Sequence, residues 1–222
     1  MKKGLVVVGI LSFLLAGCST TGSSAKETDP EVQEISVSLP AELTTLDTTQ
    51  TTDKVTFTVI QHLFEGLYRF DEKSQPVPGL AEEAVISEDG KTYTFKLKEE
   101  AKWSDGQQVQ AADFAYAWKK LVDPKTMGPN AYLLDNVVNS QDIREGKADI
   151  ATIGLETPDE KTFVVHLEQL QPSFLSVVSI GWLAPQRQSY VEEKGTAYGK
   201  TSEDLLYTGP FILKDWQQTG AE

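Results

Sequence analysis

The sequence predicts a mixed fold of helices and antiparallel strands, an α/β fold with α+β character, and three stretches of the chain predict it. Residues 111–122 place large apolar side chains three and four positions apart, a spacing that puts them on one face of a helix. Residues 85–97 and residues 157–167 each combine a charged turn with alternating apolar positions, which is typical of hairpin strands. We expect the two hairpins to be neighbours in one antiparallel sheet.

Residues 1–17 have the pattern of a secretory signal peptide, with two lysines followed by an apolar run over residues 5–15. That run is too short to cross about 30 Å of hydrocarbon comfortably. It ends in Leu-Ala-Gly-Cys, which resembles the bacterial lipobox, so we expect a lipid on Cys18, the one cysteine of the chain. The alternative is a lone secreted thiol. The small, polar and charged residues of the segment 18–33 predict a flexible tether.

The chain is acidic, with a formal net charge of −13, and removal of the signal peptide takes away two lysines and no acidic residue. Such a charge repels phosphate backbones, so we expect no nucleic-acid partner. It also gives no attraction to anionic lipid, so membrane association depends on the lipid at Cys18. The hydrophobic content of 40% is ample for a folded core.

The first regular elements are expected between residues 35 and 70. Residues 35–39 alternate as a half-buried strand does, and Pro40 ends that pattern. Asp53 is the expected N-cap of a helix over residues 55–70, where apolar side chains recur every four positions. Residues 55–59 would serve equally well as a strand, because β-branched residues alternate there.

The remaining elements follow from turn residues and short apolar runs. The Asp-Gly pair at 89–90 predicts a two-residue hairpin turn, because both residue types tolerate positive φ. Short helices are expected at 140–145 and 189–194, each closed by a glycine. Residues 174–180 are apolar and their type stays open, whereas residues 211–213 read as a buried strand.

Aromatic residues gather around the helix at 111–122 and allow two interpretations. Trp103, Phe114, Tyr116 and Trp118 could form a platform on which a ligand stacks, or they could pack in the core. Helical spacing favours core packing for Phe114 and Trp118, whereas Tyr116 lies off that face.

Six sequence blocks occur in the order found in a known family. The chain resembles the extracytoplasmic solute-binding protein family 5, whose type members are the oligopeptide-binding proteins of ABC importers. The blocks are Leu-Asp at 46–47, LFEGL at 63–67, PGLAE at 78–82, DGKTYTF at 89–95, KWSDG with A-x-DF-x-Y-x-W-K-K-L-x-DP at 102–124, and TGPF at 208–211. The resemblance carried by these blocks extends over residues 46–211, nearly all of the chain after the signal peptide and the tether.

The resemblance implies periplasmic-binding-protein-like type II lobes in an incomplete form. We expect an amino-terminal part of the solute-binding domain at 34–222, with a small inserted antiparallel-sheet lobe at about 55–175 and a return to the first lobe at the end. The resemblance implies a binding protein and not an enzyme, without cofactor or metal. It would be lipid-anchored at the cell membrane outside the cytoplasm, and its partners would be an oligopeptide ligand and ABC-transporter permease subunits.

The resemblance also points to residues that touch the peptide. By ungapped spacing, the segment whose backbone pairs with the ligand is Thr52, Asp53 and Lys54. A second contact is an aromatic residue after the Asp-Pro pair; here that position holds Asn130, and Tyr132 could take its place only if the loop shifts. The acidic residue that receives the peptide's amino terminus belongs to the later lobe, so the resemblance implies weak or no binding by this chain alone.

Three alternatives stay open at this level. Within the family, the ligand could be a signalling peptide, a nickel chelate or another small solute. The chain could instead be a surface-anchored interaction or decoy protein. A secreted zinc hydrolase would require His62, Glu65 and His166 as ligands, since Gly66 stands where the usual second histidine would be.

Overall fold

The computed structural model describes residues 34–216, so the signal peptide, Cys18 and the tether predicted before residue 34 lie outside the described residues. The chain divides into two units, residues 1–38 and residues 39–222, and every helix and strand of the described part belongs to the second. The helices and strands follow in the order α1 (Lys54–Leu63), β1 (Tyr68–Phe70), β2 (Pro76–Pro78), β3 (Ala81–Ile86), β4 (Thr92–Leu97), α2 (Ala111–Val122), α3 (Ser140–Arg144), β5 (Leu155–Asp159), β6 (Thr162–His166), α4 (Phe174–Val177) and α5 (Gln188–Lys194). Short 3-10 turns occur at Ala131–Leu134, Ile150–Thr152, Gly181–Leu183, Gly195–Ala197 and Ser202–Asp204.

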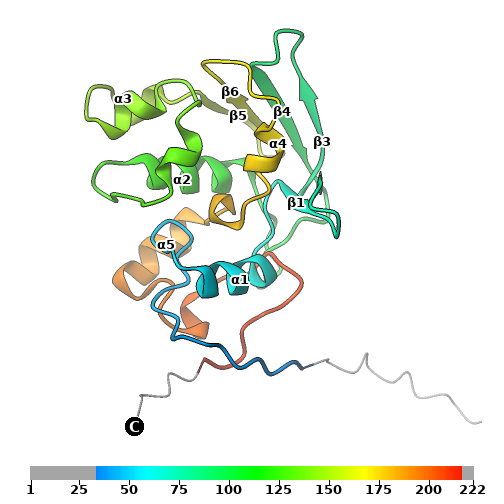
Figure 1. Cartoon of the computed structure of the whole chain (residues 1–222), viewed down its shortest axis with the longest axis vertical. Helices are drawn as coiled ribbons and strands as arrows, with labels where there is room; N and C mark the ends of the chain where they lie inside the picture. The colour runs from blue at the N-terminus through cyan, green and yellow to red at the C-terminus, as the bar shows by residue number, and fades with distance from the viewer. Residues whose placement is uncertain (1–33, 217–222) are drawn as a thin grey trace, which may run out of the picture. The chain divides into compact units, whose positions relative to one another are not determined.

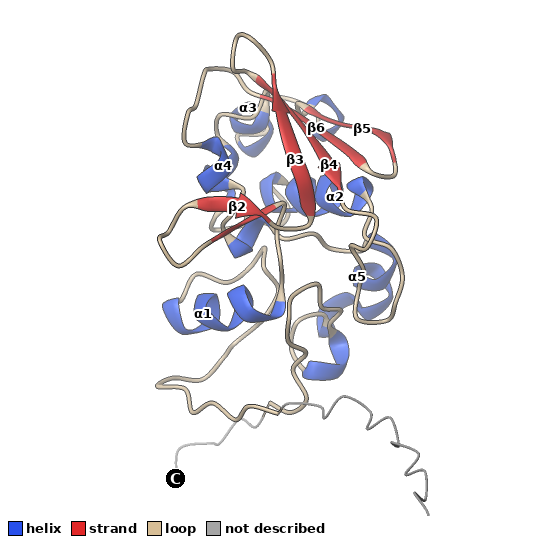
Figure 2. Cartoon of the chain, turned by 90° about the vertical axis from the view of Figure 1, so that its right-hand side faces the viewer, coloured by secondary structure: helices blue, strands red, loops and turns tan. Residues whose placement is uncertain are grey.

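Two predicted hairpins form one four-stranded antiparallel sheet in the order β3-β4-β6-β5 (Figure 2). Strand β4 pairs with β6, and Phe95 lies opposite Phe163. The alternation in β4 buries Tyr93, Phe95 and Leu97 on one face, because successive side chains of a strand point to opposite sides. The prediction that the hairpins are neighbours is therefore confirmed. Strands β1 and β2 pair separately as a small two-stranded sheet.

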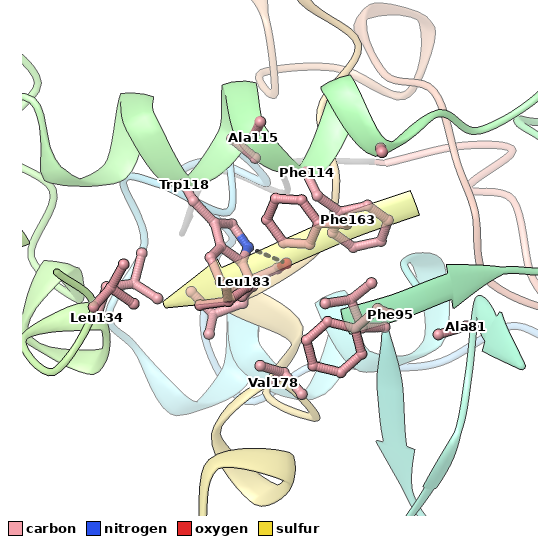
Figure 3. Packing of buried hydrophobic residues seen from close by; sticks show 14 of the residues in the cluster. Ala81, Phe95, Phe114, Ala115, Trp118, Leu134, Phe163, Val178 and Leu183 are labelled. Carbon is pink, nitrogen blue, oxygen red and sulfur yellow. Dashed lines mark hydrogen bonds between the residues drawn. The ribbon is translucent and has the colours of Figure 1, made fainter. Parts of the chain in front are cut away.

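Helix α2 covers the apolar face of this sheet and forms the centre of the larger core (Figures 1 and 3). The Trp118 and Phe163 rings meet edge to face with centroids 5.1 Å apart, and Phe114 stacks on Phe163 at 5.9 Å. Trp118 is fully buried, and its Nε1–H donates to the carbonyl of Leu183 at 3.0 Å. The expected helix at 111–122 and its core-packing interpretation are confirmed.

A second hydrophobic cluster joins segments that are far apart in the sequence. Leu46, Ile60 of α1, Ala184 and Tyr198 are buried in it, and Val191 of α5 packs there as well. In Figure 1, α1 and α5 lie below the sheet and α2. The boundaries of the inserted lobe predicted at about 55–175 stay a prediction.

The expected helix at 55–70 is shorter than its apolar period suggested. Helix α1 ends at Leu63, because Phe64 adopts an extended backbone with φ −129° and ψ 137° and the chain continues into β1. Phe64 is buried in the second cluster and Leu67 in the first. Both apolar side chains are thus buried, but in different clusters, because the chain leaves the helix between them. The regular spacing of apolar residues does not predict where the helix ends.

Two predicted strands are wrong. No strand occurs at 35–39 or at 211–213, and Phe211 and Ile212 are 39% and 66% exposed. Alternating or apolar residues indicate which side chains suit a strand, but a strand forms only where a neighbour accepts and donates its backbone hydrogen bonds. Within the described residues, neither segment has a partner strand: the Phe211 N–H donates to the His62 carbonyl at 3.3 Å, but no ladder of such bonds forms there.

The first hairpin turn also differs from its prediction. The Ser87 N–H donates to the Thr92 carbonyl at 3.0 Å, which leaves a loop of four residues between them instead of two. In that loop only Gly90 has a positive φ, 67°, whereas Asp89 accepts hydrogen bonds from the Ser87 hydroxyl and the Lys91 N–H. The helices predicted at 140–145 and 189–194 are confirmed as α3 and α5, and the open segment at 174–180 begins with helix α4.

Candidate functional site

The segment formed by Thr52, Asp53 and Lys54 lies at the start of α1 and is exposed along its whole length. Asp53 is the N-cap: its Oδ1 accepts from the Thr56 N–H at 2.7 Å, as the sequence predicted. Burial disfavours ionisation of this carboxyl, but the hydrogen bonds from Thr56 and Thr51 outweigh burial and hold the pKa of Asp53 below its ordinary value. The helix dipole also favours a negative charge at this end of α1.

A buried polar cluster anchors the chain just before this segment. Asp47 and Gln186 are 8% and 1% exposed, and Lys120 of α2 lies between them. The Lys120 Nζ donates to Asp47 Oδ2 at 2.9 Å and to Gln186 Oε1 at 3.0 Å. Gln186 Nε2 in turn donates to Asp47 Oδ1 at 2.9 Å. The cluster ties the loop before α1 to α2 and to the chain before α5.

The same cluster fixes the backbone of the loop itself. Asp47 Oδ1 accepts from the N–H and the hydroxyl of Thr49 at 3.0 and 2.7 Å, and Thr48 Oγ1 accepts from Gln186 Nε2 at 2.9 Å. Thr48 and Thr49 are buried, so these bonds replace those that water would otherwise make. The sequence indicated Asp47 and Lys120 only as parts of matching blocks, and it contained no signal for Gln186.

Asn130 contacts Thr51, the residue that precedes the segment. It is 3% exposed, and its Nδ2–H donates to the Thr51 carbonyl at 2.7 Å. Gly128 allows this approach, because a Cβ there would lie 2.5 Å from the Leu121 carbonyl oxygen and 3.2 Å from that of Thr49. The two regions that the resemblance singled out thus touch, although through Thr51 and not through the exposed segment. Tyr132 is 55% exposed.

The aromatic platform considered from the sequence does not form around α2. Trp103, Phe114 and Trp118 are all at most 3% exposed, and the Trp103 Nε1–H donates to the Asp113 carboxylate at 3.1 Å. Burial raises the pKa of Asp113, against the opposing effect of its hydrogen bonds from Gln110 and Trp103. Tyr116 is half-buried and packs against the second cluster.

The residues of the zinc alternative occupy different elements and have other partners. His62 Nδ1 lies 2.7 Å from the Thr58 carbonyl oxygen, Glu65 pairs with Arg69, and His166 pairs with Glu156. Across residues 34–216, no group of three His, Cys, Asp or Glu side chains is placed to hold a metal ion. The structure therefore offers no support for a zinc hydrolase.

The helices and antiparallel sheets have the arrangement of type II periplasmic binding proteins, of which the chain contains a portion. A family model described as "Bacterial extracellular solute-binding proteins, family 5 Middle" matches residues 75–221. The chain belongs to this family of extracellular solute-binding proteins, whose members are binding proteins. Among residues 34–216, no helix is both long and apolar enough to cross a bilayer.

Individual relatives agree with this assignment. The chain is 36% identical over 208 residues to the dipeptide-binding protein of Lactococcus lactis. The aligned region covers 94% of this chain and 36% of that protein. It superposes on Listeria monocytogenes OppA bound to peptide with a TM-score of 0.78 and 37% identity, over 81% of this chain and 36% of the other. The pheromone receptor PrgZ gives a TM-score of 0.78 at 35% identity, over 82% and 36% of the two chains. The chain thus spans little more than a third of the length of these relatives.

Proposed function

We propose that this chain is the amino-terminal portion of a substrate-binding lipoprotein that captures extended oligopeptides for an ABC importer. Family membership and the peptide-binding relatives support the proposal. The observation that carries it is the exposed segment of Thr52, Asp53 and Lys54, which is held between the Asp47 cluster and the N-terminus of α1. An exposed backbone that is held by hydrogen bonds on both sides is suited to pairing with another extended chain.

Recognition in this proposal depends on backbone groups. Pairing of main-chain N–H and C=O groups provides affinity that does not depend on the ligand's side chains, as in strand addition. Water can bridge to varied side chains at small cost, which permits a broad range of peptides. The anchoring of the segment at both ends limits the entropy lost on binding, because the backbone is ordered beforehand.

A pair of substitutions at Lys54 tests the role of the backbone. Lys54 is the first residue of α1, a position where the N–H has no acceptor within the helix and where proline is well tolerated. Asp53 has φ −79° and ψ 150°, which is compatible with a following proline. Lys54→Pro therefore removes one backbone donor and keeps the helix, whereas Lys54→Ala removes only the side chain.

The measurement is a nuclear magnetic resonance titration of the labelled chain with a pool of short random-sequence peptides, which also detects weak binding. We expect the peptides to shift the amide signals of Thr52 and Asp53, and we expect Lys54→Pro to weaken the response more than Lys54→Ala. Absence of any peptide-dependent shift would contradict a contribution of this segment to binding that is measurable without the later lobe. Equal responses of the two variants would contradict recognition through the Lys54 N–H.

The lipid anchor and the location outside the cytoplasm form part of the same proposal. The lipobox-like sequence before Cys18 supports them. Mass spectrometry of the peptide that begins at Cys18, isolated from membrane fractions, is expected to show a lipid mass on an amino-terminal cysteine. An unmodified thiol in those fractions would remove the anchor from the proposal.

A signalling peptide is the second candidate ligand, because the pheromone receptor PrgZ is among the structural relatives. The peptide pool separates the two candidates. The substrate-binding protein of a general importer is expected to bind most peptides of the pool, whereas a signalling receptor is expected to bind very few of them.

A further inference from the structure

We propose that Asn130 is a positioning residue that aims the Thr52 N–H at the ligand, an inference that rests on the proposed peptide binding. Asn130 does not reach the surface itself, since it is 3% exposed. Its Nδ2–H instead donates to the carbonyl of Thr51, which is also buried, at 2.7 Å. The side chain thus acts on a peptide group whose other half belongs to the exposed Thr52.

The geometry of the peptide group transmits this contact. No cis peptide bond occurs among the described residues, so the bond between Thr51 and Thr52 is trans and planar. Its C=O and N–H therefore point in opposite directions. A hydrogen bond that holds the Thr51 carbonyl toward Asn130 holds the Thr52 N–H away from it, toward the side of the exposed segment. Within residues 34–216, no acceptor receives a hydrogen bond from this N–H.

The hydrogen bond from Asn130 also makes the Thr52 N–H a stronger donor. A carbonyl that accepts a hydrogen bond polarises its peptide group, and this makes the N–H of the same group a better donor. The loop that carries Asn130 is itself held close to the segment, because Gln50 Nε2 donates to the Thr126 carbonyl at 3.3 Å and Gly128 packs against the Thr49 carbonyl. The direction of the Thr52 N–H is therefore set before any ligand arrives.

Asn130→Asp tests this role with a side chain of nearly the same size and shape. The substitution replaces the donor with a carboxylate oxygen that repels the Thr51 carbonyl oxygen 2.7 Å away. Asn136→Asp is the control, because the half-buried Asn136 also donates from Nδ2 to a backbone carbonyl, that of Gln169 at 2.8 Å, in a different part of the chain. Asn130→Ala removes the donor without adding a charge, and it serves as the test if the aspartate variant does not fold.

Two readouts separate positioning from a loss of stability. In the ligand-free chain, both Asn130 variants are expected to shift the amide signals of Thr52, whereas Asn136→Asp leaves them unchanged. In titrations with the pool of short peptides, the Asn130 variants are expected to lose about tenfold in affinity or more, and Asn136→Asp less than about twofold. Urea unfolding of each variant measures the accompanying loss of stability.

An unmoved Thr52 amide in the Asn130 variants would overturn the proposal, and so would an equal loss of affinity in Asn136→Asp. If the unmodified chain shows no response to peptides, binding by this portion of the protein on its own fails. The amide signals of the ligand-free variants still decide whether Asn130 orients the peptide group of Thr51 and Thr52.

Discussion

Replacement of Lys120 by methionine removes the cation from the buried cluster that anchors the loop before α1. Methionine keeps the apolar stem of the side chain and its packing on α2. It eliminates the two Nζ hydrogen bonds, to Asp47 at 2.9 Å and to Gln186 at 3.0 Å. One carboxylate oxygen and one amide oxygen then lack that donor in a region that water reaches poorly.

The size of the effect follows from the geometry and exposure of these groups. Loss of a charged hydrogen-bond partner costs about 1.5–3 kcal/mol when the remaining group stays buried. The side chains of Lys120 and Asp47 are 19% and 11% exposed, so water screens and replaces part of the interaction. We therefore expect Lys120→Met to lower the free energy of unfolding by about 2 kcal/mol.

Urea unfolding measures this loss directly. With an m-value of about 2 kcal/mol per molar urea for a chain of this size, the midpoint is expected to fall by about 1 M. Lys119→Met is the control, because Lys119 is the preceding residue of α2, is also half-buried, and makes no ion pair within the described residues. A difference of less than about 0.5 kcal/mol between the two variants would refute the role assigned to the cluster.

Three further predictions concern the cap, the core and a buried phenol. Asp53→Ala is expected to cost about 1 kcal/mol at neutral pH. The folded-state pKa of Asp53 is lowered from 3.8, so the contribution of the cap is present above the unfolded-state pKa and is lost as the pH falls through the folded-state pKa. If Asp53→Ala lowered the free energy of unfolding equally at neutral and at strongly acidic pH, the role of the cap would be contradicted. Trp118→Ala is expected to cost about 4 kcal/mol in the same assay, and a cost below about 2 kcal/mol would be incompatible with its packing against Phe163. Burial raises the pKa of Tyr198 well above 10.0. The neutral phenol therefore contributes fully to the free energy of unfolding below the pKa of an unfolded tyrosine, and this contribution is lost as the pH rises from there toward the folded-state pKa. Tyr198→Phe is expected to reduce that alkaline loss, as measured by urea unfolding across this pH range.

The local pattern of the sequence determined the elements whose signals are local. The period of three and four over residues 111–122 identified α2 and its buried face, and the alternation in the two hairpins identified β4 and β6. Asp53 was recognisable as a cap because an N-cap acts on an amide only three residues away. The ordered sequence blocks identified the family for the same reason, since each block is a short run of adjacent residues.

Tertiary structure alone decided the features that depend on distant partners. Gln186 lies 139 positions from Asp47, and Asn130 lies 79 positions from Thr51, so no period or spacing relates them. The end of α1 at Leu63 and the missing strand at 211–213 likewise depend on which neighbours are available for burial and hydrogen bonding. Sequence patterns reflect interactions between residues that are close together in the chain. The conformation of the loop that carries Thr52 is instead determined by polar groups that come together only after the chain has folded.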